Sequence, residues 1–189
     1  LRFRKEMPHV RLHIQTGPSW LLFNQLRDGF LDLVVGRMPE KSAAAGVAFQ
    51  QLHIEDVVLV ARPDHTIHNM VQPEEHISEF DLILPPSGAV ISQTVLRYLA
   101  SVGLPEMHGV IETVALPVGR KITRMSDALW FISRGVVADE LAAGSLVEVG
   151  LASPLLSGPV GISIARSAPI SVERSVLIEC LRQCGRVAH

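Results

Sequence analysis

Hydrophobic and polar residues follow two different periods along this chain. Continuous apolar runs and strict alternation predict strands, whereas apolar residues spaced three to four positions apart predict helices. The strand pattern occurs at residues 10–14, 32–36, 49–54, 56–61, 81–84, 108–112, 129–132, 146–149 and 160–165. The helical pattern occurs at residues 19–29, 91–102, 116–126, 136–143 and 171–184, with a short helix beginning at Pro73. Ser171 is the expected N-cap of the last helix.

Alternation of strands and helices predicts an α/β fold in which the sheets are mostly parallel. Turn-forming residues cluster at 62–65 and again at 153–159, and they flank a central block of about ninety residues. We therefore expect two lobes, one formed by residues 1–62 and 160–189 and the other by residues 63–159. The chain then crosses between the lobes twice, which is the arrangement of a hinge over a cleft.

Composition and charge exclude several classes of function. The chain of 189 residues is 48% hydrophobic and carries a formal net charge of −2, so it lacks the basic surface that nucleic-acid binding requires. No apolar run is long enough for a transmembrane helix, and we expect no membrane partner. Cys180 and Cys184 lie four residues apart in a predicted helix, where a disulfide does not fit, which favours a reduced, cytoplasmic setting.

Motifs for enzymes and metal sites are absent from the sequence. There is no Gly-x-Ser-x-Gly turn, Walker loop or dinucleotide fingerprint. The eight histidines, such as His65 and His68, have no cysteine or carboxylate cluster at ligand spacing. We therefore expect no catalytic residues, no metal and no cofactor. Trp130 is expected in the core, and Arg120 and Arg124 on one solvated helix face.

Several longer motifs occur in order along the whole chain. They are FRKEMPHVRL at 3–12, LRDGFLDLVVGR at 26–37, VVLVARPDH at 57–65, AAGSLV at 142–147 and GPVG at 158–161. Together they resemble the effector-binding domain of LysR-type transcriptional regulators. A narrower likeness, at IETV (111–114) and SDALWFISRGVV (126–137), resembles the regulators of protocatechuate operons and of galactose-binding proteins.

The resemblance implies a two-lobed fold like that of type 2 periplasmic binding proteins. A small effector would bind in the cleft between the lobes and alter DNA binding by an attached winged helix-turn-helix domain. That domain is expected outside this sequence, as is the first strand of the effector domain, since Leu1 corresponds to the middle of the family's first helix. The family's assembly implies a homodimer, or a tetramer at full length.

Seven residues are candidate effector ligands. Pro18, Ser19 and Trp20 stand at a predicted helix start, where free N–H groups and a positive dipole end suit a carboxylate. The residues alone favour Ser19 as the cap of its own helix, but the resemblance places effector-contacting hydroxyl groups there and so favours binding. Ser87 and Thr113 follow predicted strands, where ligands of open α/β sheets bind. Arg37 and Arg134 could pair a carboxylate or form ordinary salt bridges.

The resemblance further implies an antiparallel dimer in which residues 1–16 of one copy face the helix at 91–102 and the strand at 108–112 of the other. The apolar residues of that helix, Ile91, Val95, Leu96 and Leu99, exceed what one sheet needs to cover, although a wholly internal core is the alternative. Two rivals to the regulator remain at this point. One is the solute-binding protein of a transporter with the same fold, and the other is an enzyme built on it.

Overall fold

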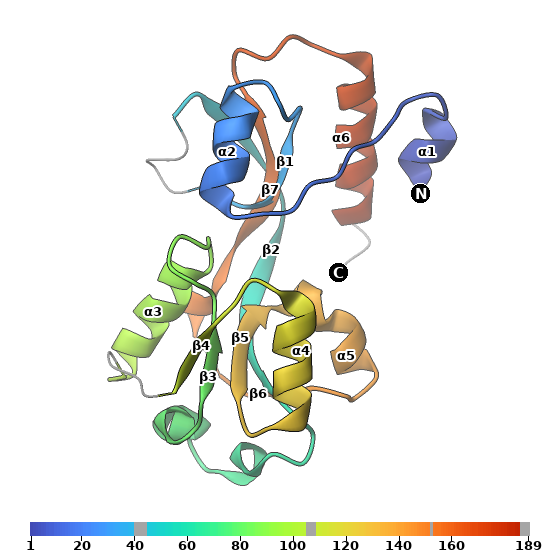
Figure 1. Cartoon of the computed structure of the whole chain (residues 1–189). Coiled ribbons are helices and arrows are strands. Elements are labelled where there is room, and N and C mark those ends of the chain that lie inside the picture. Colours follow the sequence, from blue (N-terminus) through green and yellow to red (C-terminus); the bar gives the residue numbers. More distant parts are fainter. Residues whose placement is uncertain (40–44, 105–108, 152, 186–189) are drawn as a thin grey trace. The chain divides into compact units, whose positions relative to one another are not determined.

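The computed structural model describes residues 1–39, 45–104, 109–151 and 153–185. The chain divides into two compact units (Figure 1). Unit 1 comprises Leu1–Ile54 with Pro159–His189, and unit 2 comprises Glu55–Gly158. The long strands β2 (Val47–Ala61) and β7 (Ser157–Ala165) contribute residues to both units.

Unit 1 is built on three neighbouring strands. Strand β1 (Val34–Arg37) pairs antiparallel with β7, which in turn neighbours β2. A Cβ atom at Gly161 would lie 2.2 Å from the carbonyl oxygen of Gln50, so only glycine allows β7 to approach β2 this closely. Helices α2 (Ser19–Arg27) and α6 (Val172–Gly185) lie on opposite sides of these strands, and the short α1 (Arg2–Glu6) packs on α6 (Figure 1).

Unit 2 has a sheet in the order β4 (Val110–Glu112), β3 (Leu82–Leu84), β5 (Leu129–Ser133) and β2, with β6 (Val147–Val149) also paired to β2. Strand β3 runs parallel to β4 and β5, whereas β2 runs antiparallel to β5 and β6. The expected mostly parallel sheet is therefore limited to β4, β3 and β5. The pairs of β2 with β5 and β6 are antiparallel, and so is the pair of β1 with β7.

Both faces of the unit 2 sheet are buried, as the alternation along β2 shows. Val57 and Leu59 belong to one core cluster, while Val58 and Val60 belong to the other. Helix α3 (Ser92–Ser101) covers the first face, and α4 (Leu116–Met125) and α5 (Ala138–Ala142) cover the second. Gly119 of α4 lies against the buried ring of Trp130, where a Cβ atom would come within 2.7 Å.

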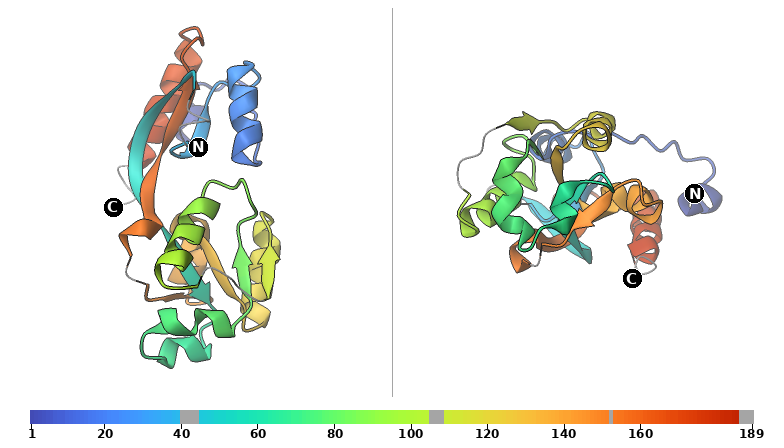
Figure 2. Two further views of the ribbon diagram at one scale, coloured as in Figure 1. Left: turned by 90° about the vertical axis from the view of Figure 1, so that its left-hand side faces the viewer. Right: turned by 90° about the horizontal axis from the view of Figure 1, so that it is seen from below.

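Four short 3₁₀ helices complete the described part of unit 2. They are η1 (Thr66–Asn69), η2 (Pro73–Glu79), η3 (Arg134–Val137) and η4 (Pro154–Leu156). The first two pack against each other at one end of the unit (Figure 2). The predicted helix at 136–143 is thus divided into η3 and α5, and the helix predicted from Pro73 is a 3₁₀ helix.

Three local predictions were wrong. Residues 10–14 form no strand, because no described strand pairs with them. The strands predicted at 49–54 and 56–61 are one strand, β2, since no turn interrupts the chain at Glu55. The helix predicted at 19–29 ends earlier, because α2 stops at Arg27, and Phe30 beyond it is 80% exposed. The stretch 39–46 is rich in Ala, Gly, Pro and Ser, which predicts a loop, but it lies largely outside the described residues. The start of the strand predicted at 108–112 also lies outside them.

Candidate functional site

The first turn of α2 presents unpaired hydrogen-bond donors. Pro18 is the N-cap residue, and its carbonyl accepts the N–H groups of Leu21 and Leu22 at 3.1 and 3.2 Å. Proline offers no side-chain acceptor, so the N–H groups of Ser19 and Trp20 have no hydrogen-bond partner among the described residues. The Ser19 hydroxyl likewise makes no bond there and does not cap the helix. This turn can therefore donate to an anion.

Trp20 and Arg37 are the other two candidates of unit 1. Trp20 belongs to the first turn of α2, and Arg37 ends strand β1. Trp20 is 58% exposed, so its ring is available to pack against a ligand. Arg37 is half-buried as the last residue of β1, and the following residue, Met38, donates to the carbonyl of Pro159 at 2.9 Å. That bond extends the pairing with β7 by one residue past Arg37.

Three candidates share one edge of the unit 2 sheet. Leu84 of β3 stands level with Glu112 of β4, and the N–H of Thr113 donates to the carbonyl of Leu84 at 3.2 Å. The carboxyl ends of these parallel strands therefore lie at the same edge of the sheet. Thr113 follows β4, the exposed Ser87 follows β3, and Arg134 follows β5. The structure thus confirms that these three residues follow the carboxyl ends of neighbouring parallel strands.

Two of these side chains already have partners. The Thr113 hydroxyl accepts the N–H of Ala115 at 2.9 Å, which leaves its own proton free to donate to a ligand. Arg134 pairs with Glu148 at 3.2 Å, and both side chains are exposed. Exposed pairs of this kind contribute little, on the order of 0–1 kcal/mol, so a ligand carboxylate can compete for Arg134. A role for Arg134 in binding stays a prediction.

Arg120 does not lie on a solvated face, and that prediction was wrong. Its guanidinium lies 2.6 Å from the Glu140 carboxylate and donates to the carbonyl of Val136 at 2.7 Å. Both ionic side chains are largely buried, so Arg120 ties α4 to the η3–α5 segment. Arg124, four residues on, is exposed as expected.

His65 is a structural residue that the sequence pattern did not reveal. It is 1% exposed, its Nδ1 accepts the N–H of Ile67 at 3.0 Å, and its Nε2 lies 3.1 Å from the carbonyl of Asp127. Since Nδ1 accepts, the proton must be on Nε2, and the neutral ring uses both nitrogens. Its ring also packs against Phe80, with centroids 4.6 Å apart. Within the described residues no group of three His, Cys, Asp or Glu side chains could hold a metal ion.

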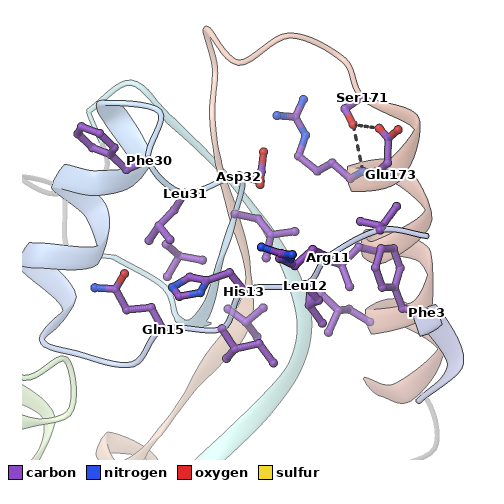
Figure 3. A pocket seen from close by; sticks show the side chains of 18 of the residues that line it. Phe3, Arg11, Leu12, His13, Gln15, Phe30, Leu31, Asp32, Ser171 and Glu173 are labelled. Carbon is purple, nitrogen blue, oxygen red and sulfur yellow. Dashed lines mark hydrogen bonds between the residues drawn. The ribbon is translucent and has the colours of Figure 1, made fainter. Parts of the chain in front are cut away.

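Two cavities formed by described residues are lined by none of the seven candidates. A groove of about 510 Å³ in unit 1 lies between residues 10–16, residues 30–35 and α6 (Figure 3). A smaller space of about 250 Å³ in unit 2 lies beside β2 and β6. The candidates instead form two separate groups, one in each unit.

A family model described as the LysR substrate-binding domain matches residues 1–185. The chain belongs to this family. Among curated proteins, the HTH-type transcriptional regulator PcaQ of Agrobacterium fabrum is 36% identical over 97% of the chain, and the chain spans 59% of that regulator. The matched relatives are transcriptional regulators rather than enzymes or transporter components.

Solved structures of other LysR effector domains have the same fold. The effector-binding domain of QuiR in complex with shikimate matches 99% of the chain with a TM-score of 0.79 at 11% identity, and the match covers 88% of that domain. The regulatory domain of Synechocystis CcmR in complex with 2-PG matches equally widely, with a TM-score of 0.80 at 11% identity and 89% coverage. The expected type 2 periplasmic-binding-protein-like fold is confirmed.

Helix α3 of this LysR domain is more deeply buried than expected for a dimer surface. Val95 and Leu99 are 1% and 2% exposed and belong to the unit 2 core, so their assignment to the dimer surface was wrong. Leu96 is 46% exposed, and Val110 on the edge strand β4 is 42% exposed. Among the described residues, no helix has the length and apolar composition needed to cross a bilayer.

Proposed function

We propose that this chain is the effector-sensing part of a cytoplasmic LysR-type transcriptional regulator and that its effector is a small molecule with a carboxylate. Membership of the substrate-binding family over residues 1–185 supports the sensing role. The chain spans 59% of PcaQ, so DNA binding by an attached domain belongs to this proposal too. QuiR is in complex with shikimate, itself a carboxylic acid, which supports the acidic class.

The observation that carries the ligand chemistry is the uncapped first turn of α2. The N–H groups of Ser19 and Trp20 and the Ser19 hydroxyl can all donate to one carboxylate, and the helix dipole adds a favourable potential. Such a bond to a charged acceptor contributes roughly 1.5–3 kcal/mol. Arg37 adds a positive charge on the same unit.

The second set of contacts lies on unit 2. Ser87 and the Thr113 hydroxyl can donate to hydroxyl or carbonyl oxygens of the effector, and Arg134 can exchange Glu148 for a ligand carboxylate. An effector that binds either set more tightly in one arrangement of the regulator favours that arrangement, and its difference in affinity for the two arrangements supplies the free energy of the switch.

We also propose that the regulator works as a homodimer. The exposed Leu96 of α3 and Val110 of β4 form the unit 2 side of the interface, and residues 1–16 of the second copy form the other. Leu12 and Ile14 in that segment are 40% and 77% exposed, so they offer apolar surface. Apolar side chains exposed on both segments are what an association site between two copies requires.

A ligand screen tests the proposed chemistry. Small carboxylic acids, their uncharged amides and simple sugars are each added to the protein, and the melting temperature is recorded. Binding to the native state alone raises stability by RT ln(1 + [L]/Kd), about 2.7 kcal/mol at a hundredfold excess over Kd. We expect stabilisation by at least one acid and none by its amide. Stabilisation by sugars or amides alone would contradict an acidic effector.

A further inference from the structure

Helix α4 of unit 2 exposes apolar and basic side chains on the face that does not pack on the sheet. Val118 and Met125 are 46% and 70% exposed, and Lys121 and Arg124 between them are exposed as well. These four residues recur at spacings of three and four, so they lie along one side of the helix. We call them the α4 surface. Apolar side chains grouped on an exposed face are typical of a protein–protein contact.

The described residues of unit 2 do not neutralise the positive charge of the α4 surface. Residues 116–125 contain three basic side chains and no acidic one. Glu140 lies 2.6 Å from Arg120, which reaches α5 and is not part of the surface. Lys121 and Arg124 form no ion pair with any residue that the structure describes. The partner that fits this surface therefore carries carboxylates next to apolar side chains.

The 3₁₀ helix η2 presents that chemistry. It contains three glutamates and no lysine or arginine. With three residues per turn, the buried Ile77 marks its inward side, and Glu75 and Glu79 lie on the outward side, where both are exposed. Among the described residues Glu75 makes no ion pair, and Glu79 pairs with His76 alone, at 2.7 Å. Val71, just before η2, is 84% exposed. We call Val71, Glu75 and Glu79 the η2 surface.

The two surfaces are neighbours in unit 2 but do not bind each other within one copy. Asp127, two residues beyond α4, bonds to Arg62 and to His65, which caps η1, and η1 packs on η2. The last turn of α4 accordingly points toward the end of the unit that η1 and η2 form (Figure 1). The ion pairs of the described residues include none between Lys121 or Arg124 and a carboxylate of η2. Two adjoining complementary surfaces can each bind the other on a second copy, related by a twofold axis.

We propose that the α4 surface binds the η2 surface of a second copy of this chain, and that a twofold axis forms the contact twice. The two basic side chains of the α4 surface meet Glu75 and Glu79, and its two apolar side chains pack with Val71. A second copy is the occupant because this chain carries both complementary surfaces. Few side chains and exposed ion pairs make the contact weak, so it forms at higher protein concentrations than the homodimer. It uses none of the residues of α3 and β4 proposed for the homodimer, and it depends on no effector.

Two charge-reversed proteins test this contact, each in a Leu96→Glu background that removes the contact proposed for α3. The first carries Lys121→Glu with Arg124→Glu, and the second carries Glu75→Lys with Glu79→Lys. Equilibrium sedimentation measures their association at protein concentrations up to about 1 mM. Each protein alone should associate roughly tenfold or more weakly than the background protein, because every ion pair of the contact becomes repulsive. An equimolar mixture should recover the association as a mixed dimer, because every pair is attractive again.

Net charge and folding are controlled separately. A variant with Arg27→Glu and Arg166→Glu, both exposed on unit 1, undergoes the same change in net charge as the first protein and should associate like the background protein. All variants should melt within a few degrees of the background protein, as exposed substitutions do. Raising the salt concentration from about 0.05 M to about 0.5 M should weaken the association of the background protein, because exposed charges are screened.

Three results would overturn the proposal. The first is a background protein that stays monomeric over the whole concentration range, which would leave the α4 surface to a different partner. The second is a mixture that associates no better than its two components. The third is a unit 1 control that weakens association as much as the charge reversals of the α4 surface do. None of these readouts involves an effector, so they are independent of the ligand chemistry proposed above.

Discussion

Ser19 and His65 show how the surroundings of a side chain set what it can do. His65 is fully buried and uses both ring nitrogens inside unit 2, so nothing remains for a metal or a ligand. The Ser19 hydroxyl and the neighbouring N–H groups have no partner among the described residues. A residue with unused donors at a helix start is therefore the better candidate for binding, although histidine is the more reactive residue type.

Tyr98 gives a pH-dependent prediction at the residue scale. Burial, helped by the nearby Glu74 carboxylate, raises the pKa of Tyr98 to about 12 from 10.0. Above pH 10 the unfolded state loses this proton first, so unfolding becomes more favourable and the stability of unit 2 declines as the pH approaches 12. In Tyr98→Phe this part of the decline should disappear.

Tyr98 is the single tyrosine of the chain, so tyrosinate absorbance reports it alone. The folded protein should titrate about two pH units above the urea-unfolded protein. The same midpoint in both states would show that the hydroxyl is not held in a buried site.

At the scale of elements, two adjacent residues of α3 have different roles. Val95 packs in the core, whereas Leu96 is proposed to lie in the dimer interface. Val95 is 1% exposed, so Val95→Glu places a charge in the core and should prevent stable folding. Leu96 is 46% exposed, so Leu96→Glu should leave the melting temperature within a few degrees of the wild type but yield monomers. Sedimentation with circular dichroism checks both properties. A folded Leu96→Glu that still sediments as a dimer would remove α3 from the interface.

Helix boundaries were predictable from sequence because their signals are local. The predicted N-cap Ser171 does accept the N–H of Arg174, at 3.3 Å, and α2 begins at Ser19 as its Gly-Pro-Ser sequence indicates. Strand formation at 10–14 was not predictable in the same way, because a strand needs a neighbour that its own residues do not specify. The Arg120–Glu140 pair joins side chains twenty residues apart and leaves no local signal.

At the scale of the whole molecule, the fold class followed from the alternation of strand and helix patterns, and motifs spread along the chain indicated the family. The edge formed by Thr113, Ser87 and Arg134 also followed, since parallel strands end together. The seven candidates come from segments far apart in the sequence, and the tertiary structure decides which of them contact the same ligand. Local sequence patterns do not encode those contacts, so the binding site is a proposal rather than a sequence prediction.

The central claim is that Ser19 binds the effector rather than capping its helix. We therefore propose to measure both the melting temperature and the Kd of the tightest-binding acid for the wild type, Ser19→Ala and Ser171→Ala. Ser19→Ala should weaken binding roughly tenfold or more, the loss of one charge-assisted hydrogen bond, with little change in melting temperature. Ser171→Ala removes a genuine cap and should lose about 1 kcal/mol of stability without a change in Kd. A lower melting temperature with an unchanged Kd for Ser19→Ala would contradict the account.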